Sequence, residues 1–138
     1  YKKKLVNLVE RYNLNKKIKF VQHCKEMPLA YSLSDVVVSA SIEPEAFGRI
    51  SVEAQSMEKP IIASNIGGSN ETVVDEKTGY LFKAGDAKSL SQKILKTLTI
   101  DETQLKLIGI EGRKNIVQKF NVEKMCFSTY SEYKRLIN

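Results

Sequence analysis

The spacing of apolar side chains predicts a helix at the start of the chain, followed by a strand. Residues 1–13 carry apolar side chains at intervals of three and four, the period of an amphipathic helix. The positions that form this stripe are Leu5, Leu8, Val9 and Tyr12. The short apolar segment 18–22 is typical of a strand. A second helix is predicted over 27–34, because Pro28 falls in its first turn, where the missing N–H is tolerated.

Two unbroken apolar runs in the middle of the chain predict strands that are buried on both faces of a sheet. Residues 35–40 read Asp-Val-Val-Val-Ser-Ala, and residues 60–64 read Pro-Ile-Ile-Ala-Ser. A shorter strand is predicted over 78–82, after a glycine turn. Helices are predicted between these strands, over about 47–57 and 69–74.

Beyond Gly85 the pattern is helical throughout. Asp86 can cap a helix, a second helix is predicted around 101–119, and Asn121 can cap a last one. Two sets of apolar positions are available for packing on the first and last of these helices: Leu90, Ile94 and Leu98, and Val122, Met125, Tyr130 and Tyr133.

Alternating strands and helices predict an α/β fold with a Rossmann-like parallel sheet and helices on both faces. We expect one domain over residues 1–138, ending in a helical C-terminal tail. Sheets of this class bind ligands beyond the carboxyl ends of their strands. The loops after Gln22, Ala40 and Ser64 are therefore the places where a site is expected.

The composition is that of an ordinary globular domain. Of its 138 residues, 42% are hydrophobic and 28% are charged. No apolar run reaches the roughly 18 residues that span a bilayer, and the chain opens on a basic helical pattern rather than a leader peptide. We therefore expect a cytoplasmic location.

The net charge of +6 is concentrated in the segments 2–4 and 16–19. These lysines are not interleaved with aromatic side chains, and the chain has no nucleic-acid motif, so no nucleic-acid partner is expected. A basic surface permits loose peripheral contact with an anionic membrane. Cys24 and Cys126 lie far apart in a chain with a single histidine, which predicts two reduced, partly buried thiols and no metal site.

Two carboxylates bracket the turn between the strand 35–40 and the helix that follows it. Glu45 and Glu53 are separated by seven residues, with Phe47 and Gly48 between them. Carboxylates accept hydrogen bonds from hydroxyls and repel phosphates, whereas a free helix N-terminus with a glycine attracts phosphates. This pattern predicts a nucleotide with a sugar attached. The alternative is that both glutamates are solvated charges that favour the N-terminal half of a helix.

Three further features lie near this turn. Gly67-Gly68 follows the strand 60–64, and it is either a second anion-facing turn or a tight turn that requires a positive φ. His23 ends the strand predicted over 18–22, where it either contacts a base or is an ordinary loop residue. Arg49 either contacts a diphosphate or is a surface residue on its helix.

The segment 41–73, SIEPEAFGRISVEAQSMEKPIIASNIGGSNETV, resembles the signature of the family 4 glycosyltransferases of GT-B fold, the group 1 glycosyl transferases. The likeness lies in Glu-x7-Glu with Phe-Gly after the first glutamate, then Lys-Pro-Ile-Ile-Ala, Gly-Gly and Glu, and it runs from about Phe20 to Phe82. It implies the C-terminal, donor-binding part of a retaining enzyme that moves a sugar from a nucleoside-diphosphate sugar to a glycan or lipid-linked acceptor. Such enzymes serve cell-surface polysaccharide and lipopolysaccharide biosynthesis.

The resemblance also implies a role for each position. Glu45 would contact the hydroxyls of the transferred sugar as the catalytic residue, and Glu53 would hold the ribose. The remaining donor-binding positions would be Ala46, Phe47, Gly48, Arg49, His23, Gly67 and Gly68. No cofactor or metal is expected, because the helix N-terminus and basic side chains would stabilise the leaving diphosphate.

The chain departs from the family pattern at its N-terminus. The two βα units that usually carry an arginine and a lysine for the diphosphate are absent, as is the acceptor-binding N-terminal domain. We therefore expect the isolated chain to be inactive. Two other functions stay open: a nucleotide-sugar epimerase of GT-B fold, and a non-catalytic domain that binds a sugar nucleotide.

Overall fold

The computed structural model describes residues 1–137, and at their centre lies a parallel sheet of three strands in the order β1-β2-β3. The strands are β1 (Val37–Ser39), β2 (Ile61–Ser64) and β3 (Tyr80–Phe82). Val37 pairs with Ile61, and Ala63 pairs with Leu81. The parallel pairing confirms the predicted α/β class.

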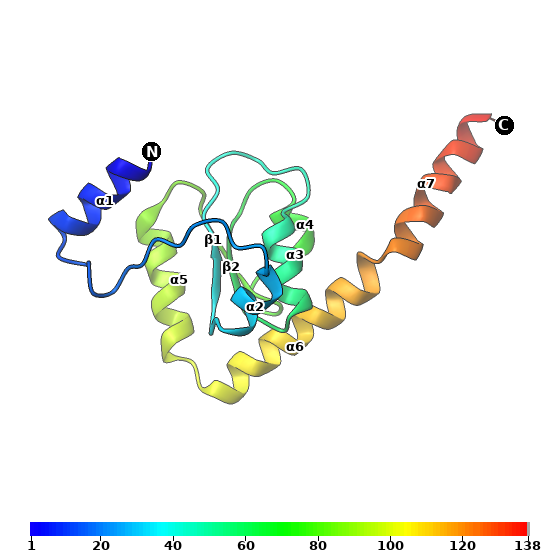
Figure 1. Ribbon diagram of the computed structural model, residues 1–138. Coiled ribbons are helices and arrows are strands. Elements are labelled where there is room, and N and C mark those ends of the chain that lie inside the picture. The colour runs from blue at the N-terminus through cyan, green and yellow to red at the C-terminus, as the bar shows by residue number, and fades with distance from the viewer. Residues whose placement is uncertain (138) are drawn as a thin grey trace.

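Helices cover both faces of this sheet, as predicted (Figure 1). The helix α3 (Arg49–Ser56) connects β1 to β2, and α4 (Ser69–Thr72) connects β2 to β3. The next helix, α5 (Ala87–Thr99), contacts β2 and β3. Successive residues of β2 divide between two apolar clusters, because side chains alternate along a strand. One cluster contains Tyr31, Ala54, Ile61, Ala63 and Val73; the other contains Ile62, Tyr80, Phe82 and Ile108.

The helix α6 (Glu102–Lys119) packs closely against α3. Gly109 and Gly112 make this approach possible, because a side chain at Gly109 would collide with the backbone of Glu58 and one at Gly112 would press on Gln55. From α6 the chain continues into α7 (Val122–Ile137), which projects away from the sheet (Figure 1). Among the described residues, α7 contributes none to the buried core, so its apolar side chains lie at the surface.

Two helices precede the sheet. The first, α1 (Lys2–Arg11), stands apart from the sheet in Figure 1 and buries only Val9 among its described residues. Asn13, with a left-handed φ of 54°, lies just after its end. The second, α2 (Met27–Ser32), has Pro28 in its first turn, as predicted, and buries Tyr31 against the sheet.

The predicted helix caps are present. The Asp86 carboxylate accepts hydrogen bonds from the N–H groups of Lys88 and Ser89, both over 3.0 Å, at the start of α5. Asn121 Oδ1 accepts from the N–H of Lys124 over 2.8 Å at the start of α7. Both caps confirm the helix starts expected from the sequence.

The strand predicted over 18–22 is wrong. A strand requires backbone partners, and this segment pairs with none of the strands in the described part of the chain. Its apolar side chains remain exposed, with Val21 at 84%. The prediction that 35–40 would be buried on both faces is also wrong, because β1 is an edge strand and Val38 is 42% exposed. Only β2 is buried along its whole length.

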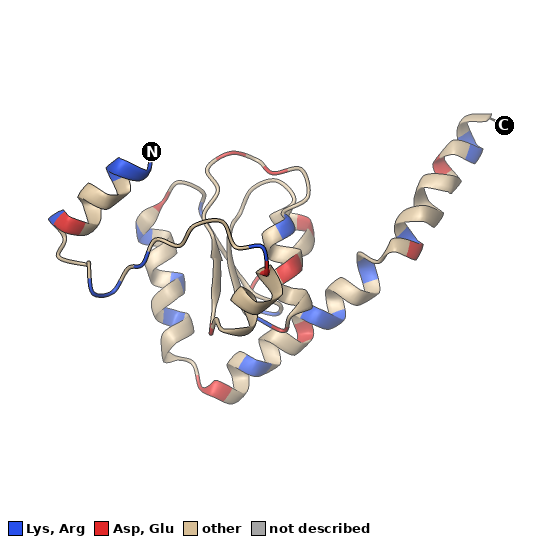
Figure 2. Ribbon diagram, viewed as in Figure 1, with Lys and Arg blue, Asp and Glu red and all other residues tan. Residues whose placement is uncertain are grey.

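The prediction for the cysteines is partly confirmed. Both thiols are free and Cys24 is half-buried, but Cys126 is exposed on α7 rather than partly buried. Lysines and arginines are distributed over α1, α5, α6 and α7 with acidic residues among them (Figure 2). None of the helices within residues 1–137 is both long enough and apolar enough to cross a membrane.

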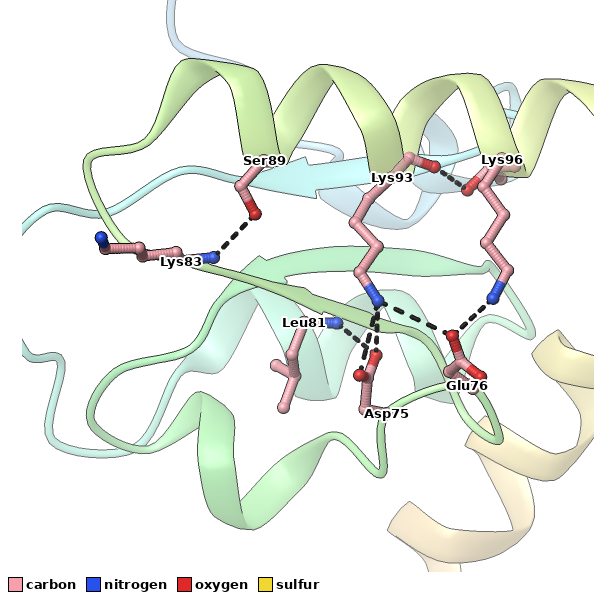
Figure 3. A network of polar contacts seen from close by, with 8 residues as sticks. Asp75, Glu76, Leu81, Lys83, Ser89, Lys93 and Lys96 are labelled. Carbon is pink, nitrogen blue, oxygen red and sulfur yellow. Dashed lines mark hydrogen bonds and ion pairs between the residues drawn. The ribbon is translucent and has the colours of Figure 1, made fainter.

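An ionic network ties α5 to the outer side of β3 (Figure 3). Lys93 Nζ lies 3.4 Å from Asp75 Oδ1, and Lys96 Nζ lies 2.5 Å from Glu76 Oε1. Asp75 Oδ1 also accepts the N–H of Leu81 over 2.8 Å. This last hydrogen bond satisfies a backbone donor of an edge strand, which would otherwise face solvent.

Candidate functional site

The loop between β1 and α3 carries Glu45 at the carboxyl edge of the sheet. Its half-buried side chain is oriented by Ser41, whose hydroxyl donates a hydrogen bond to Glu45 Oε1. Its backbone is fixed by the next loop along the sheet, because the N–H of Gly68 donates to the carbonyl oxygen of Glu45 over 2.8 Å. The carboxylate of Glu45 is therefore held at a defined place rather than being a mobile surface charge.

The Gly67-Gly68 pair lies directly against this loop. Gly67 has a φ of +58°, and a Cβ atom there would lie 2.5 Å from the carbonyl oxygen of Glu45. A Cβ atom at Gly68 would collide with the backbone of Phe47. The tight turn with a positive φ, one of the two interpretations of this pair, is therefore present. A contact of the pair with a bound anion stays a prediction.

Gly48 forms the start of α3. It has a left-handed φ of 72° and is buried, so the helix begins at Arg49 rather than at Phe47 as predicted. A Cβ atom at Gly48 would lie 3.2 Å from the backbone nitrogen of Ser69. Within residues 1–137, no side chain caps the first N–H groups of α3. These donors and the positive end of the helix dipole are suited to a negatively charged ligand.

Glu53 is held by two partners, one on each carboxylate oxygen. The hydroxyl of Tyr31 donates to Oε2 over 2.9 Å, and Arg49 Nη2 donates to Oε1 over 3.0 Å. The side chain of Glu53 is 35% exposed. Glu53 is thus an anchored carboxylate rather than the solvated charge of the alternative interpretation. Arg49 is 83% exposed and pairs with Glu53 in this structure; its contact with a diphosphate stays a prediction.

The environment of Tyr31 keeps its hydroxyl protonated. Burial raises the pKa of Tyr31 to about 12, with further increases from the hydrogen bond to Glu53 and from the negative charge of that carboxylate. The guanidinium of Arg49 acts in the opposite direction. At neutral pH, Tyr31 is therefore a permanent hydrogen-bond donor to Glu53.

Phe47 extends from the loop toward the C-terminal helices. Its ring packs edge-to-face on Phe120, with ring centroids 5.7 Å apart. Both rings line a cavity of about 500 Å³ that is closed by the junction of α6 and α7. The side chain of Phe47 is therefore used in packing, which leaves its backbone N–H for the donor-binding role predicted for it, a role that stays untested.

His23 is exposed, three residues before the N-cap of α2, and the structure does not bring it together with the other predicted residues. By contrast, it brings Glu45, Ala46, Phe47 and Gly48 together with Gly67 and Gly68, and it joins Arg49 to Glu53. The residues that sequence reasoning missed are Ser41, Tyr31 and Phe120. Tyr31 lies 22 residues from Glu53, a separation that no local spacing rule connects.

No group of three or more histidine, cysteine, aspartate or glutamate side chains that could hold a metal ion occurs within residues 1–137. Whether the full-length protein needs a metal stays a prediction.

The arrangement of two anchored carboxylates around an uncapped helix start matches a known family. The family model of the glycosyl transferases group 1 matches residues 1–115. The chain belongs to this family. Its fold is that of the GT-B glycosyltransferases, with a helical C-terminal segment.

Similar proteins of this family include enzymes of polysaccharide and glycan assembly. The chain is 35% identical over 107 residues to the capsular polysaccharide biosynthesis glycosyltransferase CapM of Staphylococcus aureus, covering 78% of this chain and 28% of that protein. It is 36% identical over 91 residues to the alpha-1,3/1,6-mannosyltransferase ALG2 of Candida albicans, covering 61% of this chain and 20% of that protein.

Two solved structures extend the comparison. A glycosyltransferase from Rickettsia africae is 32% identical with a TM-score of 0.88, covering 99% of this chain and 36% of that one. HepE of Anabaena, described in complex with UDP-glucose, is 27% identical with a TM-score of 0.86, covering 96% of this chain and 37% of that one. The chain thus spans about a third of the length of the CapM, Rickettsia and HepE proteins.

Proposed function

We propose that the full-length protein transfers a sugar from a nucleoside-diphosphate sugar to a glycan or lipid-linked acceptor, with retention of anomeric configuration. The observation that carries this proposal is the anchoring of Glu45 between Ser41 and Gly68 at the uncapped start of α3, in a chain of the group 1 family. The likeness to CapM supports a place in cell-surface polysaccharide or lipopolysaccharide biosynthesis. The HepE complex with UDP-glucose supports a nucleotide-sugar donor.

In this proposal the two carboxylates read two different sets of hydroxyls. Glu45 accepts hydrogen bonds from the transferred sugar, close to the bond that breaks. Glu53 accepts from the ribose, one helical turn or more along α3. Neither carboxylate faces the diphosphate, which like charges would repel.

The diphosphate lies at the start of α3 in this proposal. The backbone N–H groups from Ala46 to Arg49 and the helix dipole oppose its charge, which grows as the glycosidic bond breaks and the diphosphate leaves. Gly67 and Gly68 keep this loop in place by packing against its backbone. No metal ion is needed for these roles, and the parts of the full-length protein outside this chain would supply the acceptor site and further cations.

Location and membrane contact belong to the same proposal. A lipid-linked acceptor would require the protein to act at the cytoplasmic face of a membrane, and the exposed lysines of segments 2–4 and 16–19 would favour an anionic surface. Sedimentation of the full-length protein with vesicles of anionic lipid, but not with neutral ones, would support this contact. Equal sedimentation with both vesicles would contradict it.

The experiment for the proposed function uses the full-length protein. A thermal-shift panel of UDP, GDP and ADP and of their sugar derivatives identifies the donor, and product analysis of that donor follows. Transfer or hydrolysis with a retained anomer is the expected result. Interconversion of free sugar nucleotides would instead identify an epimerase, and binding without turnover would identify a non-catalytic binding domain.

A further inference from the structure

We propose that Tyr31 is a positioning residue for donor binding: it fixes the Glu53 carboxylate so that this residue accepts the ribose hydroxyls and selects ribonucleotides. This inference rests on the proposed function and extends it to a residue outside the Glu-x7-Glu motif. The geometry that carries it is the hydrogen bond of 2.9 Å from the Tyr31 hydroxyl to Glu53 Oε2, which joins α2 to α3.

The ring of Tyr31 is immobilised by the core. Tyr31 is only 5% exposed and belongs to the apolar cluster formed with Ala54, Ile61, Ala63 and Val73. A phenol ring packed in this way has a defined rotamer, so the position of its hydroxyl is set by the sheet and by α3. The donor that meets Glu53 is therefore part of the scaffold.

The other partner of Glu53 is not part of the scaffold. Arg49 is 83% exposed, and an ion pair between residues four apart on a helix surface restrains its members only weakly. Without the hydroxyl of Tyr31, the carboxylate would be free to follow Arg49 toward solvent. Tyr31 thus decides where the carboxylate lies, and Arg49 neutralises its charge from the solvent side.

The division of the two oxygens leaves one of them accessible to a ligand. Tyr31 approaches Oε2 from the core, while Oε1 faces the mobile Arg49 at the surface. Vicinal hydroxyls of a ribose are neutral donors that can replace or join the Arg49 contact at Oε1. Because an anchored carboxylate has already lost its rotamer freedom, binding these hydroxyls costs less entropy than it would with a free side chain.

The decisive experiment compares Tyr31→Phe with wild type in the full-length protein, by calorimetric titration with UDP and with 2′,3′-dideoxy-UDP. The variant removes the hydroxyl and keeps the ring. We expect its affinity for UDP to fall about threefold to tenfold, while its affinity for the dideoxy ligand stays unchanged. A loss confined to the ligand with hydroxyls shows positioning of Glu53, which a general structural defect would not produce.

The matched control is Tyr80→Phe. Tyr80 is 1% exposed but lies in the other apolar cluster, so its hydroxyl is lost from a buried ring that has no contact with Glu53. This variant is expected to keep the preference for UDP. Glu53→Gln is expected to lose it, and adding Tyr31→Phe to Glu53→Gln should produce no further loss of preference.

Three outcomes would overturn the inference. One is an unchanged ribose preference in Tyr31→Phe when Glu53→Gln loses it, and another is an equal loss for both ligands. If Tyr31→Phe does not fold, Glu53→Asp shortens the reach to Tyr31 by one methylene, and a retained preference in that variant contradicts the inference. A wild-type protein that binds none of UDP, GDP and ADP would be a different failure, because it refutes the proposed function itself.

Discussion

The N–H of Gly68 donates a hydrogen bond of 2.8 Å to the carbonyl oxygen of Glu45. This contact joins the loop after β1 to the loop after β2, so the two loops at the carboxyl edge of the sheet form one unit. The unit exists because positions 67 and 68 have no side chains: at either position a Cβ atom would occupy the space of the backbone between Pro44 and Phe47. The position of Glu45 thus depends on glycines more than 20 residues away in the chain.

Substitution of Gly67 by alanine should weaken both stability and donor binding. Gly67 and Gly85 both have a positive φ, of 58° and 74°, so alanine at either costs about 1–2 kcal/mol of backbone strain. Only at Gly67 does the added Cβ also meet the backbone of Glu45, at 2.5 Å, whereas at Gly85 no atom lies within 4 Å. Overpacking of this kind costs about 1–3 kcal/mol more.

The comparison of Gly67→Ala with Gly85→Ala therefore isolates the contact between the two loops. Urea denaturation gives the free energies of unfolding, and titration with the donor found in the thermal-shift panel gives the affinities. We expect the Gly85 variant to bind the donor normally. Equal stability of the two variants would show that the contact with Glu45 contributes nothing.

Replacing the two motif glutamates should have different kinetic effects in the full-length enzyme. Glu45→Gln should lower kcat by about a hundredfold, because its charge acts near the breaking bond. Glu53→Gln should mainly raise KM for the donor, by about tenfold, because it removes a charge-assisted hydrogen bond to the ribose. Steady-state kinetics measures both effects.

Glu43→Gln is the matched control for this pair. Glu43 lies in the same loop two residues before Glu45, and it is exposed. Its kinetics should stay at the wild-type level. If the two motif variants behaved like this control, the assignment of the site would be wrong.

The parts of the fold that were predictable from the sequence are those determined locally. The caps at Asp86 and Asn121 each depend on a few neighbouring residues, and both are present. Strands 60–64 and 78–82 were also located, to within a residue or two at their ends. The segment 18–22 has a strand-like composition but no partner strand, and no local pattern reveals whether a partner exists.

The same distinction applies to the site. The motif around Glu45 and Glu53 is a local pattern and was recognisable. That Gly67 and Gly68 support Glu45, and that Tyr31 supports Glu53, follows only from the packing of loops and helices that are distant in the chain. A tyrosine in a short apolar helix gave no sign that its hydroxyl would meet a carboxylate 22 residues later.

Stability at alkaline pH should depend on Tyr31. The pKa of Tyr31 is raised from 10.0 to about 12 in the folded protein, chiefly by burial. As the pH rises above 10.0, the unfolded chain loses this proton first, so the free energy of unfolding decreases until the pH passes the folded value. Below 10.0 both states hold the proton and no such dependence exists.

Tyr31→Phe removes the titrating group and should therefore flatten the alkaline decline. Urea denaturation of wild type and variant at increasing pH gives the two curves. A smaller decline remains in both proteins, because burial also raises the pKa of Tyr80. Identical slopes in the two proteins would contradict the coupling of Tyr31 to Glu53 and the core.

The last prediction concerns the outer side of β3, where two neighbouring acids make unequal contributions. Asp75 pairs with Lys93 and also accepts the backbone N–H of Leu81 over 2.8 Å, whereas Glu76 makes ion pairs only. Asp75→Ala leaves a strand donor without its partner, and the free energy of unfolding should fall by about 1 kcal/mol. Asp75→Asn keeps an oxygen acceptor and should recover most of this loss.

Glu76→Ala should have a smaller effect that depends on salt and on acid. The hydrogen bond from Lys96 lowers the pKa of Glu76, so the stability it contributes is present at neutral pH and is lost as the pH falls through the folded pKa. Because this pair is exposed, added salt should remove its effect while leaving most of the Asp75 effect, which comes from a backbone hydrogen bond. Urea denaturation at low and high salt distinguishes the two, and an Asp75→Ala effect that vanishes with salt would show that the Leu81 contact does not stabilise the edge of the sheet.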